Sequence, residues 1–468
     1  MYKNYLKFIS FGSLALLAVL LVVATIVERI YGVAFYSSPC FVALWAVMLL
    51  TAMLYIFSTS VKRVVATLFL HLAFAVVLVG AFVTYLTGER GSLYLCKDAL
   101  PSSMFVKNDG GLVSFPFRVT LNDSRVVFAD GDNTPRDYVA ELLVQLPGGA
   151  NEIATLSMNH VYDREGFRFF LSDVAGEGVT LLVSHDPWGV PITYSGYFLV
   201  ALGFLFLFAS RKTQMKGLKL WLETKGSSQS GKVTFSRKII ILFPALCLFG
   251  CITYQGVCRW VDTALFPVTD GVGVMMLIAW CSSLSAIVLL RKNGALALGA
   301  LCFALLCVGG ALTGGVAHLG AVAPVLRTPL LPLHVATIAV SYLFIGLLAV
   351  NSLIALSLYW LKCDYNRLER MSASGRILLY FATFLLVVGI FLGAVWANIS
   401  WGRYWGWDPK EVWALVTLLV CSFGFHTHSL PFMARPLVFH AFSIVVFFVA
   451  LFTYLGVNLL FGGLHAYA

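Results

Sequence analysis

Residues 6–32 read LKFISFGSLALLAVLLVVATIVERIYG, an almost uninterrupted apolar run. The run is too long for the apolar region of a signal peptide and lacks a small-residue cleavage site, so it predicts a retained first membrane span. Further apolar runs have the length needed to cross a hydrocarbon core about 30 Å thick. The eleven predicted spans are 7–27, 39–57, 65–86, 191–209, 238–255, 272–290, 295–313, 333–360, 376–397, 410–428 and 437–460.

The composition agrees with this pattern. Of the 468 residues, 60% are hydrophobic and 12% are charged, and the mean hydropathy is +0.88. A soluble protein of this size could not bury so much apolar surface. We therefore predict an all-α polytopic membrane protein of about eleven transmembrane helices, with a small β-rich extracytoplasmic domain inserted after the third helix.

The basic residues predict the orientation in the membrane. If the N-terminus is cytoplasmic, the connections on that side carry nineteen Lys and Arg residues, and the short outer connections carry five. Because cytoplasmic loops collect positive charge, we expect the N-terminus in the cytoplasm and the C-terminus outside. The net charge of +10 then reflects orientation and does not indicate nucleic-acid binding.

The one long polar insertion, 87–190, falls on the outer side. Its segment LVSFPFRVTL (112–121) alternates apolar and polar residues as a strand does, and LPGGANE (146–152) is typical of a turn. Eight basic and fourteen acidic residues give the insertion a net charge of −6, which again argues against nucleic acid. The predicted organisation is three helices in 1–86, the β-rich domain in 87–190, a fourth helix in 191–210, a basic cytoplasmic linker in 211–237 and seven helices in 238–468.

The segment WGRYWGWDPKEVWAL (401–415) holds four of the eleven tryptophans. Asp408, Pro409 and Glu411 have the spacing of a helix N-cap, a proline at the first helical position and a capping-box partner. We expect Asp408 to begin the next helix, and a catalytic carboxylate is the less favoured interpretation.

The tryptophans Trp401, Trp405 and Trp407 precede or adjoin this cap on the outer side. They could belong to the aromatic belt of the membrane interface. They could instead form a flat apolar platform for a planar ligand, because they are packed among glycines, whereas belt residues are scattered.

Two pairs of histidines are candidate metal ligands. His71 and His426 lie in apolar runs at matched depth, where two imidazoles could hold one haem iron from both sides. His334 and His465 lie at the outer ends of two spans, on the same side as the tryptophans, and suggest a second bis-histidine haem site. Polar contacts between helices, and ordinary interfacial histidines, are the alternatives.

The ten cysteines lie mostly inside apolar runs, and none forms a C-x-x-C pair. This argues against a thioredoxin-type redox motif and against a haem attachment site in this chain. Buried apolar filling is the simplest role for these side chains.

Segments in both halves of the chain resemble a known family. The WGRYWGWDPKEVWAL segment and the terminal LFTYLGVNLLFGGLHAY resemble the WWD haem-handling region of the Ccs-type (System II) cytochrome c synthases. TIVERIYG, HLAFAVVLVGAFVT and SHDPWGVPITYSGYFLVALGFLF resemble the companion ResB-like protein. The chain thus resembles a fusion of both, with 238–468 as the WWD haem-handling domain.

The resemblance implies the residue roles. His71 and His426 match the family's intramembrane haem ligands, and His334 and His465 match its external ligands. Trp401, Trp405, Trp407 and Asp408 match the WWD motif. The outer insertion is short for a ResB-like protein, which puts its family role in doubt, and His440 has no place in the family pattern.

The implied activity is that of a holocytochrome c synthase, or cytochrome c haem lyase, in a bacterial cytoplasmic membrane. Haem b, as substrate and bound ligand, would cross the membrane and be joined to the C-x-x-C-H cysteines of apocytochrome c, by positioning and without a side-chain nucleophile. A separate protein would reduce the thiols. The alternatives are a haem exporter or chaperone that hands haem on, and, less favoured, a haem b electron-transfer subunit.

Overall fold

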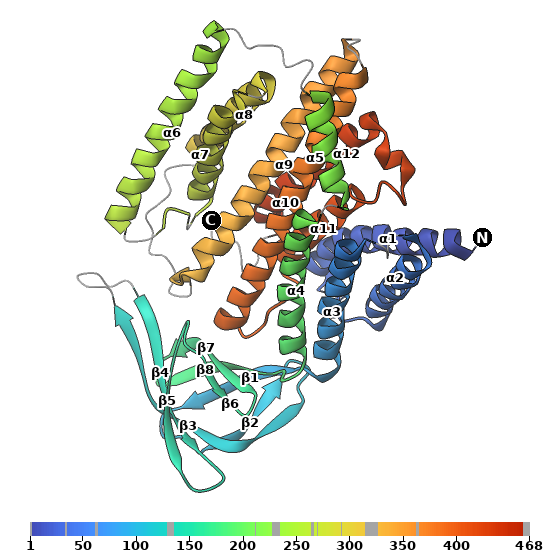
Figure 1. Ribbon diagram of the computed structural model, residues 1–468. Helices are drawn as coiled ribbons and strands as arrows, with labels where there is room; N and C mark the ends of the chain where they lie inside the picture. The colour runs from blue at the N-terminus through green and yellow to red at the C-terminus, as the bar shows by residue number, and fades with distance from the viewer. Residues whose placement is uncertain are drawn as a thin grey trace.

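The computed structural model describes residues 2–32, 35–60, 64–128, 135–210, 212–226, 235–263, 266–268, 270–291, 293–313, 326–361 and 365–461. Helices form the larger part of the described chain, and one β-sheet lies at one end of this helical part (Figure 1). We refer to the end that carries the sheet as the sheet end and to the other as the far end.

The described residues contain ten helices that are long and apolar enough to cross a membrane, judged by length and composition. The chain is thus a mostly helical, multi-pass membrane protein, as predicted. The helices before the second half are α1 (Tyr2–Tyr31), α2 (Pro39–Ser58), α3 (Val65–Thr87), α4 (Gly189–Ala209) and α5 (Gln214–Gly226). They are followed by α6 (Phe235–Thr263), α7 (Gly271–Leu289), α8 (Gly294–Thr313), α9 (Leu330–Trp360), α10 (Tyr365–Ser400), α11 (Pro409–Phe423), the 3-10 helix η3 (Pro431–Ala434), α12 (Pro436–Leu451), the π-helical segment η4 (Phe452–Gly456) and α13 (Val457–Leu460).

Two helices differ from the sequence-based expectation. The predicted span 410–428 is α11, which has 15 residues and ends at Phe423, so it falls short of the other spans. Helix α5 lies inside the predicted linker 211–237. Its sequence, QMKGLKLWLETKG, is rich in good helix formers, and Met215 and Leu218 pack on a small core beside α10.

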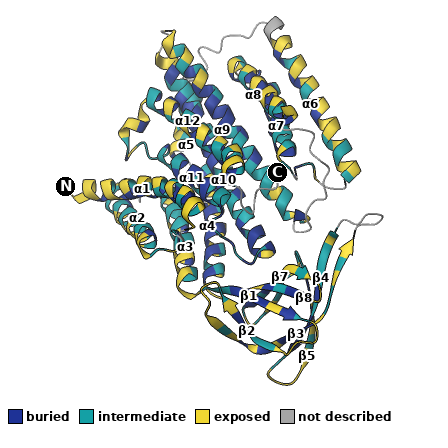
Figure 2. Ribbon diagram, turned by 180° about the vertical axis from the view of Figure 1, so that it is seen from behind, coloured by how far each residue is buried: buried dark blue, intermediate teal, exposed yellow. Residues whose placement is uncertain are grey.

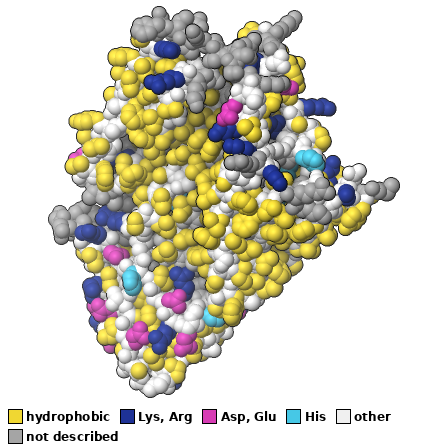
Figure 3. Space-filling model, viewed as in Figure 1, with side chains coloured by type: hydrophobic (Ala, Val, Ile, Leu, Met, Phe, Trp, Pro, Cys, Tyr) yellow, Lys and Arg dark blue, Asp and Glu magenta, His cyan; other side chains and the backbone are white. Residues whose placement is uncertain are grey.

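The arrangement of the helices is seen in two views. Helix α1 runs at a steep angle to α3, α4 and α9, and α3 and α4 descend together to the sheet (Figures 1 and 2). Hydrophobic side chains cover much of the helical part, and charged ones gather over the sheet and toward the far end (Figure 3). This distribution suits a bundle whose middle faces lipid.

The predicted β-rich region after the third helix is an antiparallel sheet of eight strands in the order β5-β4-β3-β2-β1-β8-β7-β6. The strands are β1 (Glu89–Cys96), β2 (Ser102–Lys107), β3 (Leu112–Phe128), β4 (Pro135–Gln145), β5 (Asn151–Ser157), β6 (Tyr162–Arg164), β7 (Phe167–Ala175) and β8 (Gly178–His185). Phe115, Phe117 and Val119 of β3 share the buried face, as their alternation predicted. The predicted turn at 146–150 joins β4 to β5.

Candidate functional site

Two histidines that are far apart in the chain meet within the helical part. His71 lies in α3 and His426 lies just beyond the end of α11. The centroids of their imidazole rings are 6.0 Å apart, and the ring planes make an angle of 78°. The structure therefore brings together the two side chains that the sequence singled out as the inner pair.

Hydrogen bonds orient both rings. The Nδ1 atom of His71 lies 2.7 Å from the Thr67 carbonyl oxygen, and that of His426 lies 2.8 Å from the Ser422 carbonyl oxygen. A carbonyl oxygen only accepts, so each Nδ1 carries the proton. A neutral ring then keeps the lone pair on Nε2, which is the form that binds a metal. The pair can offer two imidazole nitrogens to one iron.

The backbone around His426 differs from the expectation of a histidine inside a span. Helix α11 ends at Phe423, Gly424 is its C-cap, and His426 lies in the turns that follow. The ring of Phe11 from α1 packs edge-on against the His426 ring at 5.1 Å. His426 thus lies on a loop, and the rings of Phe11 and His71 from the first half of the chain pack against it.

Of the outer histidine pair, only His334 lies within the described residues. His334 is on α9, and its Nδ1 lies 2.7 Å from the Gly389 carbonyl oxygen of α10. A Cβ atom on Gly393 would lie 2.6 Å from Cε1 of His334, so this glycine makes room for the ring. His465 lies outside the described residues, and its pairing with His334 stays a prediction.

The cap at the start of α11 is confirmed. The Lys410 amide donates to Oδ1 of Asp408 at 3.0 Å, and Oε2 of Glu411 accepts from the Asp408 amide at 3.2 Å. The same Glu411 oxygen accepts from the Gly406 amide at 2.8 Å. Asp408 therefore begins the helix and ties the tryptophan-rich loop to it.

The tryptophan rings do not form one flat surface. Trp405 and Trp407 lie edge to face, with centroids 5.8 Å apart and planes at 87°. Trp407 stacks on Tyr36 at 4.6 Å and 6°, and Trp401 packs at 68° against Trp396. Trp405 and Trp407 are therefore not coplanar, and Trp407 packs one face against Tyr36 from the first half of the chain. A platform for a planar ligand stays a prediction.

Two further features concern the backbone of Trp407 and the indole nitrogen of Trp405. Trp407 has a φ of +56°, a conformation that bulky residues rarely adopt outside functional or tightly held sites. The indole nitrogen of Trp405 is buried and has no hydrogen-bond partner among the described residues. The indole nitrogens of Trp45 and Trp413 are buried without a partner among the described residues in the same way.

The sheet and the first half of the chain support the loop that carries these tryptophans. The Tyr404 hydroxyl donates to Thr84 of α3 at 2.9 Å, and Thr84 donates to Asp186 at 2.6 Å. Ser400 donates to Asn159 at 3.2 Å. Gly402 has a φ of +72°, and a Cβ there would lie 2.6 Å from the Phe170 ring of β7, so only glycine fits.

Arg90 of β1 lies near this hydrogen-bonded chain. Burial lowers its pKa, and the nearby Asp186 carboxylate opposes that shift. Its Nε atom is buried without a partner among the described residues. Sequence reasoning missed Arg90, Thr84 and Asp186, because each is an ordinary polar residue in its own segment.

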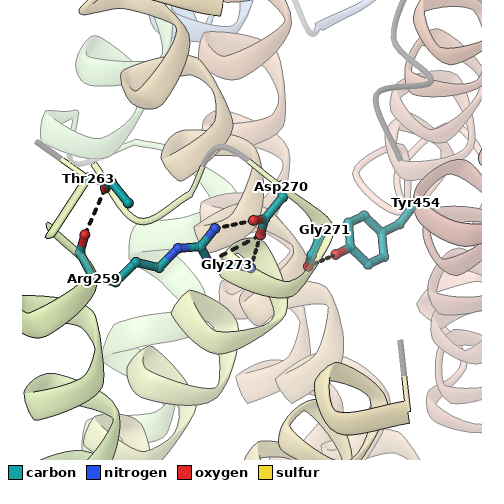
Figure 4. Close-up of polar contacts among 6 residues, drawn as sticks. All are labelled: Arg259, Thr263, Asp270, Gly271, Gly273 and Tyr454. Carbon is teal, nitrogen blue, oxygen red and sulfur yellow. Dashed lines mark hydrogen bonds and ion pairs between the residues drawn. The ribbon is translucent and has the colours of Figure 1, made fainter. Parts of the chain in front are cut away.

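A second polar cluster joins the sheet ends of α6, α7 and the C-terminal helices (Figure 4). Asp270 caps α7 by accepting from the Gly273 amide at 2.6 Å, and Arg259 of α6 pairs with it through two nitrogens. The Tyr454 hydroxyl donates to the Gly271 carbonyl at 2.8 Å. Tyr454 belongs to η4, and π-helical segments are frequent at functional sites.

His440, which the sequence could not place, is fully buried in α12. Its Nδ1 lies 3.0 Å from the Ser352 hydroxyl of α9, and its Nε2 has no partner among the described residues.

Comparison with known proteins adds two family matches. Residues 269–465 match the family described as Cytochrome C assembly protein, and residues 61–181 match the ResB-like family. Three curated relatives are similar. The chain is 36% identical over 214 residues to Protein NrfI of Wolinella succinogenes, over 43% of this chain and 23% of that protein. The chain thus spans about a quarter of that relative's length.

Two shorter relatives are covered almost completely. The chain is 29% identical over 284 residues to the Cytochrome c biogenesis protein CcsA of Chlorella vulgaris, over 50% of this chain and 89% of that protein. It is 31% identical over 253 residues to the CcsA protein of Guillardia theta, over 47% of this chain and 83% of that protein.

Proposed function

This chain belongs to the CcsA family of cytochrome c biogenesis proteins and carries a ResB-like segment ahead of the CcsA-like part, and from this we propose that it is a holocytochrome c synthase. In this proposal it takes haem b across a membrane and attaches it covalently to the C-x-x-C-H cysteines of apocytochrome c. The membrane is a bacterial cytoplasmic membrane, with the N-terminus in the cytoplasm and the tryptophan-rich loop outside.

The observation that carries the proposal is the meeting of His71 and His426. Their centroids lie 6.0 Å apart, and each ring has its Nδ1 proton committed to a carbonyl. Two neutral imidazoles so placed would hold a haem iron through their Nε2 nitrogens. One ring comes from the ResB-like half and the other from the CcsA-like half, so the inner site needs both.

The outer site in this proposal is built from His334, His465 and the WWD residues Trp401, Trp405, Trp407 and Asp408. The oriented His334 ring supports it. Asp408 acts by fixing the edge of the loop, and Trp407 by tying that loop to Tyr36.

The attachment step is an addition. The sulfur of each cysteine thiol bonds to a vinyl carbon, and the thiol hydrogen ends on the neighbouring carbon, so atoms balance and no oxidant is consumed. The chain's contribution is to hold two vinyl groups against two thiols, which is positioning catalysis. The thiols have to be reduced, and we assign that task to a separate reductant protein.

Co-expression tests the proposal. The chain is produced in a host without its own cytochrome c maturation system, together with a C-x-x-C-H reporter, and covalent haem is scored on denaturing gels. We expect haem-stained reporter with the wild type and none with the His71→Ala variant. A reporter cysteine pair changed to serine is the control for covalent attachment.

The alternative of a haem exporter or chaperone gives a different result in the same experiment. Haem would copurify with the membrane protein, and the reporter would carry no covalent haem. That outcome would reject the synthase proposal and retain haem handling.

A further inference from the structure

We propose that Arg376 is a positioning residue that holds the loop bearing His426 in the geometry needed for the inner site. This inference rests on the proposed function of the His71–His426 pair. The loop in question, 424–435, joins α11 to α12 and includes η3.

Arg376 contacts both ends of that loop. It lies in α10 and is 9% exposed. Its Nη2 donates to the Met433 carbonyl at 2.6 Å, and its Nη1 donates to the Gly424 carbonyl at 3.4 Å. One planar guanidinium thus joins Gly424, the C-cap of α11, to Met433, which lies shortly before α12. The planar fork of arginine carries its donors on two separate nitrogens, which suits two carbonyls better than the compact ammonium of lysine does.

The charge of Arg376 is compensated without a carboxylate. Among the described residues no acidic side chain forms an ion pair with it. Gly424 is the C-cap of α11, so its carbonyl sits at the negative end of that helix's dipole, and the Met433 carbonyl of η3 adds a second neutral acceptor. The Phe439 ring of α12 lies 4.2 Å from the guanidinium carbon and adds a cation–π contact.

Other contacts hold the middle of the loop. Gln214 of α5 donates to the Thr427 hydroxyl at 2.6 Å and accepts from Tyr380 at 3.4 Å. The Tyr55 hydroxyl of α2 donates to Ser429 at 3.1 Å. These are neutral and partly exposed contacts, whereas the Arg376 contacts are charged and buried, so we expect Arg376 to contribute most.

The link to the ligand is short. Gly424 is two residues before His426, and the His426 Nδ1 hydrogen bond goes to Ser422 in the last turn of α11. A shift of the Gly424 carbonyl therefore changes the position of the imidazole relative to His71. Partners that orient a metal-binding histidine typically change affinity or activity about 10- to 100-fold when they are removed.

The test uses the full chain, purified in detergent with its haem. Arg376→Lys keeps the positive charge and loses the fork, and Arg376→Gln also loses the charge. Arg367→Lys is the matched control, because Arg367 lies on the same helix and is exposed. Haem content and the absorption spectrum of bis-imidazole iron are measured, with and without added imidazole, and every variant carries His334→Ala as well, so that the spectrum comes from the inner site.

We expect both Arg376 variants to lose the bis-imidazole spectrum, with haem affinity about tenfold weaker or more, and imidazole to restore the spectrum. Arg367→Lys should behave as wild type. An unchanged spectrum in both variants, or a loss that imidazole does not restore in a folded Arg376→Lys protein, would overturn the inference. If Arg376→Gln does not fold, Arg376→Lys decides.

The same experiment separates this inference from the proposed function. If His71→Ala leaves the wild-type spectrum intact, the inner-site assignment fails, and the role given to Arg376 fails with it. If the spectrum depends on His71 but not on Arg376, only the positioning role is lost.

Discussion

Asp408 is a single side chain that sets where the tryptophan-rich loop ends. It accepts from the Lys410 amide, and Glu411 completes the reciprocal bond. Both interactions are local in sequence, which is why the D-P-K-E spacing alone predicted them. We therefore predict that this aspartate acts by placing its aromatic neighbours.

Substitution of Asp408 tests this role. Asparagine caps a helix about as well as aspartate, so Asp408→Asn should keep most of the covalent product. Asp408→Leu removes the acceptor and should cost about 1 kcal/mol in the unfolding free energy, with a clear loss of product. Thermal unfolding in detergent and haem-stained gels measure both. Equal loss in the two variants would instead indicate that the carboxylate charge is required.

Histidines show the limit of reasoning from single residues. The sequence indicated that His71 and His426 lie at similar depth, but the ring separation and the committed Nδ1 protons come from the structure. For His440, residue identity was no guide at all, and its contact with Ser352 depends on the packing of α12 against α9.

At the scale of elements, α9 and α10 are packed closely around His334. Their contact depends on Gly393 of α10, where a Cβ would lie 2.6 Å from the imidazole. Small residues allow such approach between membrane helices. The His334 ring is held at the same place by the Gly389 carbonyl.

A methyl group at Gly393 should displace the His334 ring. We expect Gly393→Ala to lower covalent product about 100-fold, because a shift of about 1 Å can have that effect, and to leave haem at the inner site. Gly309→Ala is the matched control, since nothing lies within 4 Å of a Cβ there. Product is scored on denaturing gels, and inner-site haem is measured as the part of the bis-imidazole spectrum that His71→Ala removes. Unchanged product in Gly393→Ala would contradict the role of His334.

The ends of elements were harder to predict than their existence. The run 412–425 is almost entirely apolar, yet α11 ends at Phe423 and turns follow. Gly424 and Pro431 indicated an earlier helix end, but the prediction gave more weight to the apolar character of the run. Helix α5 was not predicted because its charged residues suggested a linker. The same residues nevertheless favour a helix.

At the scale of the whole molecule, the two halves depend on each other. Trp407 stacks on Tyr36, Tyr404 bonds Thr84, and His426 lies beside His71. Each contact joins the ResB-like half to the CcsA-like half. The covalent connection between them is therefore one of several links.

Cutting that connection should be tolerated. We expect residues 1–226 and 227–468, expressed as two chains, to copurify through a tag on one of them and to retain haem. Trp407→Ala in the second chain should weaken copurification, because it removes the stacked pair with Tyr36. Detection of both chains and of haem in the eluate is the measurement. Halves that purify separately would show that the tertiary contacts are too weak to hold them.

The sequence by itself predicted the class of the protein, the β-rich insertion, the helix cap at Asp408 and, to within one, the ten candidate spans of the described residues. These depend on local properties, namely apolar run length, alternation and spacing. Only the tertiary structure decided that Trp405 and Trp407 lie edge to face, that Thr84 and Asp186 support Tyr404, and that Arg376 grips both ends of the His426 loop. Those contacts join residues distant in the chain, and their geometry follows from how whole helices pack.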